Sequence, residues 1–258
     1  MLIGTMNNPG NDVVEEIRSV ADMGMQFVDL TLEPPRAATE TIDVDAVRGA
    51  LEKYRLPVVG HTAFYLPLAS AIEGIRQAAL AEFRRSIRIF SQLGASWMNV
   101  HLDRFTPFHD RSFFVRRNIE SLRELLPEAA EDGIGLMIEN LPGEFNNAAQ
   151  VGEVLDALPE LGLHLDFGHA NLLVPYNTSR EMLAAYGDRL RHVHLHDNKG
   201  GHEDLHLPLG AGNVDVPGVV HALKDAGYDG TITLEVFTPD RHYLTYSRDV
   251  LRRLWDIG

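Results

Sequence analysis

The segment LHLDFGHANL, residues 163–172, places two histidines and an aspartate within an apolar run that is typical of a buried strand. An ionised carboxylate such as that of Asp166 is costly in apolar surroundings unless a cation compensates its charge. His169 follows three residues later, where a loop would open after the strand. Imidazole nitrogens and carboxylate oxygens are common protein ligands of divalent transition metals. The segment therefore predicts that a cation compensates Asp166, and that His169 binds a neighbouring cation or the molecule on which it acts.

Polar residues recur at the ends of the other apolar runs. The candidate ligands at these ends are His61, His101, Glu139, Asp166, His194 and Glu235. The loop candidates are His169 and the D-x-H pair Asp204 and His206, whose alternating spacing allows both side chains to turn toward one ion. Crowded carboxylates repel one another and stay partly protonated unless a cation lies between them. A ligand set of His, Asp and Glu without thiolates suits Zn²⁺, Mn²⁺, Fe²⁺ or Co²⁺ better than Ca²⁺.

These residues must be positioned by the elements that carry them, and the chain alternates short apolar runs with stretches of helical period. The expected strands cover residues 2–6, 27–33, 57–61, 97–102, 136–140, 163–167, 192–196 and 231–237. The expected helices cover residues 12–23, 43–54, 71–93, 112–132, 147–158, 179–186, 216–226 and 243–255. Gly24, Gly94, Gly133 and Gly227 stand where helix C-caps are expected.

Eight strand–helix units in 258 residues predict one α/β domain over residues 1–258, a (β/α)8 TIM barrel. A doubly wound open sheet is the alternative, but it ordinarily has fewer strands, and no GxGxxG turn follows the first expected strand. In a barrel, the carboxyl ends of the strands form one mouth, where active sites are built. The barrel therefore predicts that the six strand-end residues face one cavity.

Composition narrows the classes of function. The chain has no cysteine, which excludes disulfides, thiolate ligands and a cysteine nucleophile, and is compatible with a cytoplasmic location. Its formal net charge of −14 disfavours a general attraction to nucleic acid or anionic membranes. We expect no signal peptide, because no basic region precedes an apolar stretch at the N-terminus. We also expect no membrane span, because no apolar run approaches the ~20 residues that one needs.

Taken together, the segments HTAFYLPLAS, NVHLD, MIENLPG, LDFGHAN, HVHLHDN, DLHLPLGAGNVD and LEV resemble the xylose isomerase-like TIM barrel superfamily. This superfamily, also called AP endonuclease family 2, includes endonuclease IV and many sugar isomerases and epimerases. The resemblance covers nearly the whole chain and implies the same barrel fold. It also implies a divalent metal, with Zn or Mn as the first choices.

The resemblance implies ligand roles that differ between two branches of the superfamily. The endonuclease IV branch holds three ions on nine residues, all of which have counterparts here. His61, His101 and Glu139 would hold one ion, which Glu139 would bridge to a second. Asp166, His194 and Glu235 would complete the second, and His169, Asp204 and His206 would hold the third. The epimerase branch keeps one ion, on residues matching Glu139, Asp166, His194 and Glu235, and there the counterpart of His169 contacts substrate.

Two chemistries remain open, with isomerisation ahead of nuclease activity. A metal-dependent isomerase or epimerase of a small sugar or sugar phosphate would use Glu139 and Glu235 as the acid/base pair around an enediolate. Dehydratases and other lyases use the same chemistry. The alternative is a zinc-dependent AP endonuclease acting on DNA, which the complete nine-residue set favours. Against it, Leu205 stands where the nuclease branch carries an arginine, and Arg36 is the one arginine in LTLEPPRAATETID. A barrel that binds without turnover is disfavoured, since no ligand is missing.

Some residues are candidates for contact with substrate rather than with metal. Glu33 could meet a hydroxyl, Phe64 and Tyr65 could stack on a ring, and Arg104 and Lys199 could meet a phosphate or carboxylate. Packing or surface exposure is the simpler interpretation of each. Of the other histidines, we expect His164 and His192 to be hydrogen-bonded beneath the site and leave His196 undecided. We expect His109, His202, His221 and His242 on the surface or in loops.

Overall fold

The computed structural model describes residues 1–257, which form a closed barrel of parallel strands in sequence order, as the sequence predicts. The strands are β1 (Leu2–Met6), β2 (Val28–Leu32), β3 (Val58–Thr62), β4 (Trp97–Val100), β5 (Gly135–Glu139), β6 (Gly162–Asp166), β7 (Leu190–Leu195) and β8 (Thr231–Leu234). Pairing of β8 with β1, through partners such as Ile232 and Ile3, closes the barrel. A closed sheet leaves no strand edge unpaired.

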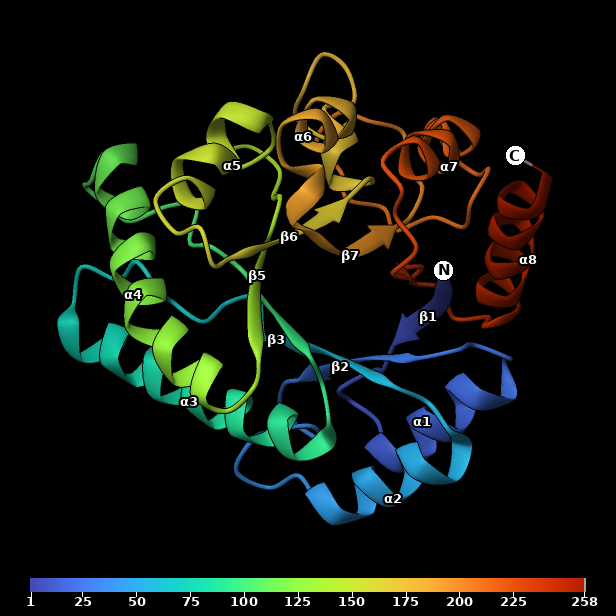
Figure 1. Ribbon diagram of the computed structural model, residues 1–258, viewed down its shortest axis with the longest axis horizontal. Coiled ribbons are helices and arrows are strands. Elements are labelled where there is room, and N and C mark those ends of the chain that lie inside the picture. Colours follow the sequence, from blue (N-terminus) through green and yellow to red (C-terminus); the bar gives the residue numbers. More distant parts are fainter. Residues whose placement is uncertain (258) are drawn as a thin grey trace.

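Helices surround the strands as an outer ring (Figure 1). They are α1 (Val13–Asp22), α2 (Val44–Tyr54), α3 (Glu73–Leu93), α4 (Arg111–Glu131), α5 (Ala148–Leu155), α6 (Ser179–Tyr186), α7 (Val216–Asp225) and α8 (His242–Ile257), with short 3-10 turns η1 (His169–Asn171) and η2 (Gly187–Arg189). Within residues 1–257, no helix combines the length and the apolarity that crossing a membrane requires.

Side-chain caps explain where several helices begin. The carboxylates of Asp12, Asp43 and Asp110 accept hydrogen bonds from backbone N–H groups three residues ahead, at 3.0–3.1 Å. The side chain of Asn147 does the same for α5, at 2.9 Å. Each bond satisfies one of the N–H groups that a helix start leaves without a partner. Gly94 ends α3 in the left-handed conformation at φ 78°, as a C-cap glycine does.

The core lies between the strands and the surrounding helices. Its fully buried side chains include Ile17, Leu30, Phe83, Phe90 and Met98. Gly60 in β3 illustrates how tightly the layers pack, because a Cβ at this position would lie 2.8 Å from the ring of Phe90 in α3. Interiors packed at this density tolerate little added volume. The strands that carry the polar residues are therefore held firmly in place.

Two predicted elements run three residues past the observed ends. The strand expected over residues 231–237 ends at Leu234, because the following stretch turns toward the loop after β7, where the N–H of Phe237 donates to the carbonyl of His206. The helix expected over residues 147–158 ends at Leu155. Pro159 disfavours helical geometry for the residue that precedes it, which shortens this helix.

Candidate metal centre

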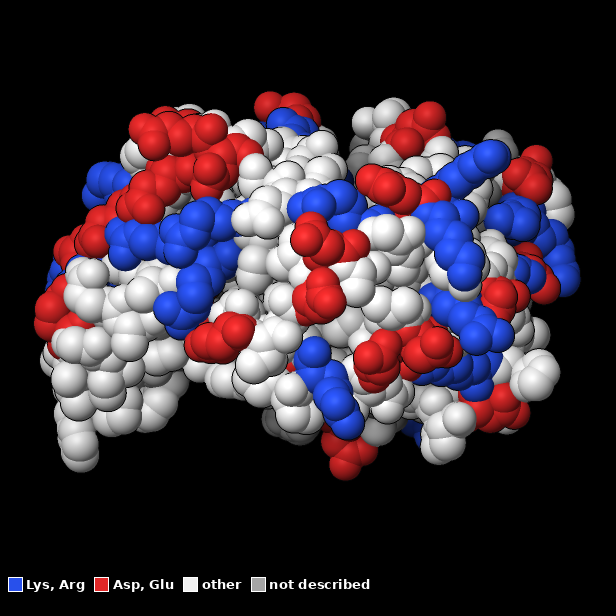
Figure 2. Space-filling model, turned by 90° about the horizontal axis from the view of Figure 1, so that it is seen from below, with Lys and Arg blue, Asp and Glu red and all other residues white. Residues whose placement is uncertain are grey.

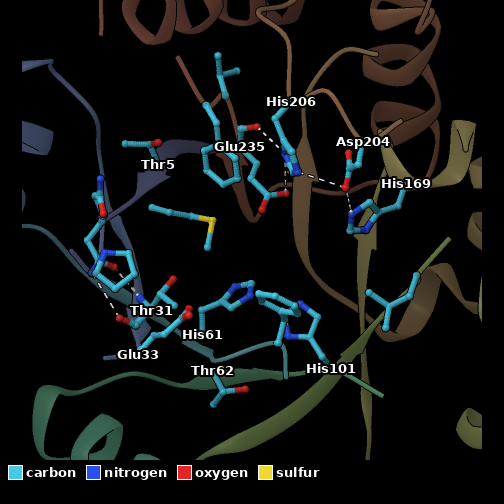
Figure 3. A pocket seen from close by; sticks show the side chains of 18 of the residues that line it. Thr5, Thr31, Glu33, His61, Thr62, His101, His169, Asp204, His206 and Glu235 are labelled. Atoms are coloured by element: carbon cyan, nitrogen blue, oxygen red, sulfur yellow. Dashed lines mark hydrogen bonds and ion pairs between the residues drawn. The ribbon is translucent and has the colours of Figure 1, made fainter. Parts of the chain in front are cut away.

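The strand-end residues meet at one mouth of the barrel, as expected. His61, Glu139, Asp166 and His194 lie within β3, β5, β6 and β7, and His101 and Glu235 follow β4 and β8 directly. All six are buried, with side-chain exposures of 11% or less. The wall above them encloses a cavity of about 850 Å³, which Figure 3 shows from close by. His61, His101 and Glu235 line this cavity, whereas Glu139, Asp166 and His194 lie in the buried layer around them, where apolar side chains would ordinarily fill a barrel.

His61, His101 and Glu139 form the first group. The Nε2 atom of His101 lies 3.0 Å from Oε2 of Glu139, and the rings of His61 and His101 lie side by side with their centroids 4.9 Å apart (Figure 3). One ligand atom from each of the three residues lies within 4.8 Å of the other two. Asn99 donates to Oε2 of Glu139 at 2.8 Å, so this carboxylate is oriented by a neutral neighbour.

Asp166, His194 and Glu235 form the second group, beside the first. The Nδ1 atom of His194 lies 3.1 Å from Oε2 of Glu235 and 3.9 Å from Oδ2 of Asp166. Oδ2 of Asp166 is buried without any hydrogen-bond partner. Such an atom is costly unless a ligand satisfies it. The other oxygen of Glu139, Oε1, lies 3.1 Å from Nδ1 of His169, which itself lies 3.4 Å from Oδ2 of Asp166, so His169 stands between the first and second groups.

His169, Asp204 and His206 form the third group. Oδ2 of Asp204 lies 3.0 Å from Nε2 of His169 and 3.2 Å from Nε2 of His206 (Figure 3). His206 has a φ of 44°, in the left-handed region that non-glycine residues seldom adopt and that is often found at functional sites. The structure therefore brings together all nine candidate ligands.

In two of these histidines, the ring nitrogen that does not face Asp204 lies close to a backbone carbonyl oxygen. Nδ1 of His169 lies 3.0 Å from the carbonyl oxygen of Asn140, and Nδ1 of His206 lies 3.1 Å from that of Glu235. Because a carbonyl oxygen can only accept, each Nδ1 carries a proton, and Nε2, which faces Asp204, is the nitrogen that could bind a metal ion in place of its own proton. Histidines that bind metals are commonly oriented in this way.

The electrostatics of the site depend on histidine. Burial acts to raise the pKa of Glu139, but the imidazoles of His164 and His101 outweigh it and hold that pKa well below the ordinary value. Burial likewise acts to lower the pKa of His169, but the carboxylates of Asp166 and Asp204 outweigh it and raise that pKa. Among residues 1–257, the ion-pair partners of Glu139, Asp166, Asp204 and Glu235 are histidines only, with no Lys or Arg.

This arrangement fits a divalent metal. Protons on histidine are the only counter-charges that the described chain offers to four carboxylates, and a metal ion replaces such protons when it binds. A cation would satisfy the unpartnered oxygen of Asp166, and it would bind Nε2 of His169 and of His206, since Nδ1 of each ring faces a carbonyl oxygen. The mixed imidazole and carboxylate donors match Zn²⁺ or Mn²⁺.

The predicted substrate contacts are brought together only in part. Glu33, Phe64 and Arg104 line the cavity with the metal-ligand candidates. Phe64 is 67% exposed, and Arg104 donates to the backbone carbonyl of Pro142 at 3.2 Å. Lys199 is exposed and is not among the residues that line the cavity. His202, expected in a loop, is exposed but lines the cavity rim.

The remaining histidines differ from one another. His192 lies beneath the site and is hydrogen-bonded to Thr231 and Thr233, as expected. His164 is fully buried beside Glu139, but neither of its ring nitrogens has a hydrogen-bond partner, contrary to expectation. Burial and the neighbouring His194 hold the pKa of His164 well below its ordinary value. His196 is buried, with Nε2 3.4 Å from Asp166. His109, His221 and His242 are exposed.

Two polar residues of this region escaped the sequence reasoning. Asp29 in β2 is fully buried and contacts His192 and His194. Its signal was present, because an aspartate within the apolar run VDLTL is as costly as Asp166 in its own run. Arg241 lines the cavity and makes a two-pronged ion pair with Glu16, at 2.6 and 2.8 Å. No local pattern marks Arg241, because its partner lies at the other end of the chain.

Known proteins resemble this chain over most of its length. The model of the family described as xylose isomerase-like TIM barrel matches residues 17–254. A probable endonuclease 4 of Aquifex aeolicus is 25% identical over 98% of each chain. An L-ribulose 3-epimerase of a Methylomonas species is 27% identical over 93% of this chain and 84% of its own. The crystal structure of a D-tagatose 3-epimerase-like protein superimposes with a TM-score of 0.85, at 24% identity, over 100% of this chain and 98% of its own.

Proposed function

Because this chain belongs to the xylose isomerase-like TIM barrel family, we propose that it is a divalent-metal-dependent isomerase or epimerase of a small sugar or sugar phosphate. The observation that carries the proposal is a continuous cluster: Glu139 and Asp166 both face His169, and Asp166 and Glu235 both face His194, with histidines as the only ionic partners of these carboxylates within residues 1–257. Glu235 lines a cavity of about 850 Å³, in the size range of about 300–1,000 Å³ that holds small ligands.

Glu139, Asp166, His194 and Glu235 would hold the ion. When bound, a divalent cation polarises the carbonyl and the adjacent hydroxyl of a sugar, which acidifies the C–H bond between them. Glu139 and Glu235 stand at the ends of β5 and β8, with β6 and β7 between them, so they reach the substrate from different directions. One carboxylate removes the proton and the other, in its protonated form, returns one to the same carbon or its neighbour.

Other side chains would bind and orient the sugar. His169 reaches into the cavity from the loop after β6, and Glu33 from the end of β2 (Figure 3). We assign to them hydrogen bonds with substrate hydroxyls. Phe64 offers an apolar ring at the rim. Arg241 is neutralised by Glu16, whereas the side chain of Arg104 contacts a neutral carbonyl group. Arg104 is therefore the better candidate for binding a phosphate on the substrate.

The substrate class is supported by the names of the relatives. Among the similar proteins are an L-ribulose 3-epimerase and a D-tagatose 3-epimerase-like protein, so ketoses and their phosphates are the first compounds to test. The metal-loaded protein is incubated with each compound in D₂O. We expect deuterium to enter the substrate at the carbon beside the carbonyl group. Metal-loaded protein that exchanges no deuterium into any ketose or ketose phosphate would contradict the proposal.

A second candidate function is AP endonuclease activity. The third group, His169, Asp204 and His206, supports it because it completes a nine-residue ligand set, and a probable endonuclease 4 is among the relatives. The net charge of −14 weighs against it, since contacts with DNA phosphates require Lys and Arg. On the face shown in Figure 2, basic side chains are interspersed with acidic ones. Cleavage of an abasic-site duplex, without exchange of deuterium into sugars, would favour the nuclease.

A further inference from the structure

Asp29 is a buried carboxylate of β2 whose partners come from three other strands. Its side chain has no exposed surface, and it contacts His61 in β3, His192 and His194 in β7 and Thr233 in β8. It is not among the residues that line the cavity. Asp29 therefore contacts the proposed metal centre through two ligand candidates, His61 and His194.

The two oxygens of Asp29 have different environments. Oδ2 lies 2.7 Å from Nε2 of His194, 2.9 Å from the hydroxyl of Thr233 and 3.2 Å from Nε2 of His192. Oδ1 has no hydrogen bond and lies 3.6 Å from Nδ1 of His61, which also has none. One oxygen is thus fully used, and the other faces the ring of a second ligand candidate.

The bond to His194 determines which nitrogen of that ring can bind a metal. An ionised carboxylate only accepts hydrogen bonds, so Nε2 of His194 must carry a proton. In a ring that binds a metal, the other nitrogen, Nδ1, is then the one with a free lone pair. Nδ1 is also the atom that lies 3.1 Å from Glu235 and 3.9 Å from Asp166. The hydrogen bond between Nε2 and Asp29 and the closeness of Nδ1 to the two carboxylates therefore both assign Nδ1 as the metal-binding atom.

We propose that Asp29 is a positioning residue for the metal centre: it holds His194 with Nε2 protonated and Nδ1 directed at the metal, and its second carboxylate oxygen faces Nδ1 of His61, which leaves Nε2 of that ring as the metal-binding nitrogen. This inference rests on the proposed metal site. Two other roles are possible for such a residue. It could be a metal ligand itself, because ligand atoms of Asp29, His61 and His194 lie within 4.8 Å of one another. It could also serve the stability of the barrel alone.

Substitution of Asp29 separates these roles. Asp29→Asn keeps the size of the side chain but removes its charge and one acceptor. If Asp29 positions the ligands, Zn²⁺ affinity, measured by competition with a chelator, should fall about 10- to 100-fold with the number of bound ions unchanged, as is usual when a partner of a ligand is lost. The matched control is Thr231→Val, which removes the 2.7 Å contact with Nδ1 of His192 from the same buried network without touching Asp29. It should leave Zn²⁺ affinity unchanged.

The other outcomes are distinct. Unchanged Zn²⁺ affinity in Asp29→Asn, with lower stability of the metal-free protein, would show a purely structural role and overturn the inference. Loss of a whole equivalent of metal would make Asp29 a ligand and also overturn it. If the unsubstituted protein binds no Zn²⁺, the proposed metal site fails and the inference fails with it.

A second measurement does not depend on folding of the Asp29 variant. In the metal-loaded, unsubstituted protein with ¹⁵N-labelled histidine, the ring signals of His194 can be assigned by their loss in His194→Gln. We expect Nε2 of His194 to carry the proton and Nδ1 to show the shift of a metal-bound nitrogen. A proton on Nδ1, or metal bound through Nε2, would overturn the inference.

Discussion

Nε2 of His169, at the start of the loop after β6, lies 3.0 Å from Oδ2 of Asp204, in the loop after β7. This contact joins two loops over the mouth of the barrel and completes a cluster that an epimerase with one ion does not need. The chain therefore carries ligand candidates for more metal ions than its proposed chemistry requires.

The first prediction concerns the amount of metal. We expect more than one equivalent per chain after loading with Zn²⁺ and removal of excess, because all three groups are formed. Asp204→Asn should lower the count by one, since Asp204 is the only carboxylate of the third group. Elemental analysis measures the count, and the exposed neighbour Glu203, changed to Gln, is the control. One ion or none in the unsubstituted protein would rule out the three-ion arrangement.

The second prediction concerns the acid/base pair. Glu139→Gln should lower kcat/KM by at least about 10²–10⁴-fold, the usual contribution of a positioned acid or base, and further if metal is lost as well. Metal content and kcat/KM are to be measured on the same sample, with Glu203→Gln again as the control. Substantial activity in the variant would exclude Glu139 both as a bridging ligand and as a base.

The third prediction concerns stability and pH in the metal-free protein. Carboxylate neighbours raise the pKa of His169 and of His194 well above the ordinary value of 6.5, although burial acts to lower both. Their contribution to stability is therefore complete below pH 6.5 and is lost as the pH rises through the raised values. Each unit of pKa difference contributes about 1.4 kcal/mol.

Thermal unfolding between pH 6 and 10, with and without a chelator, measures this effect. We expect the melting temperature of the metal-free protein to fall as the pH rises, whereas bound metal should reduce the fall because it replaces the protons on these rings. His221→Gln is a control, since His221 is exposed and distant from the site. Equal pH dependence in both samples would show that the histidines do not compensate the carboxylates.

The fourth prediction concerns the scaffold that holds β3. Gly60→Ala would place a Cβ 2.8 Å from the ring of Phe90, and we expect it to lower the free energy of unfolding by about 1–3 kcal/mol, as overpacking does. Gly74→Ala is the matched control, because nothing lies within 4 Å of its added Cβ in the first turn of α3. Denaturant unfolding of both variants tests this, and equal stability would contradict the packing at β3.

The fold and much of the site could be predicted because both depend on local patterns. A polar residue that ends an apolar run is visible in one segment, and the barrel places all such ends at one mouth. Asp29 shows the limit of this reasoning. It stands near the start of its strand rather than at the end, and its partners His192 and His194 are more than 160 residues away. Lys199 shows another limit, since the path of a loop depends on contacts that no local pattern records.

Glu235 uses two of its atoms on two different histidines: its carboxylate faces Nδ1 of His194 at 3.1 Å, and its backbone carbonyl lies 3.1 Å from Nδ1 of His206. A single residue thus contacts a ligand candidate of both the second and the third group, so a shift of its backbone would move both contacts. An ion that settles in one group pre-arranges its neighbour, which lowers the cost of filling it. Loading of the centre is therefore expected to be cooperative, with partly filled molecules scarce at intermediate metal concentrations.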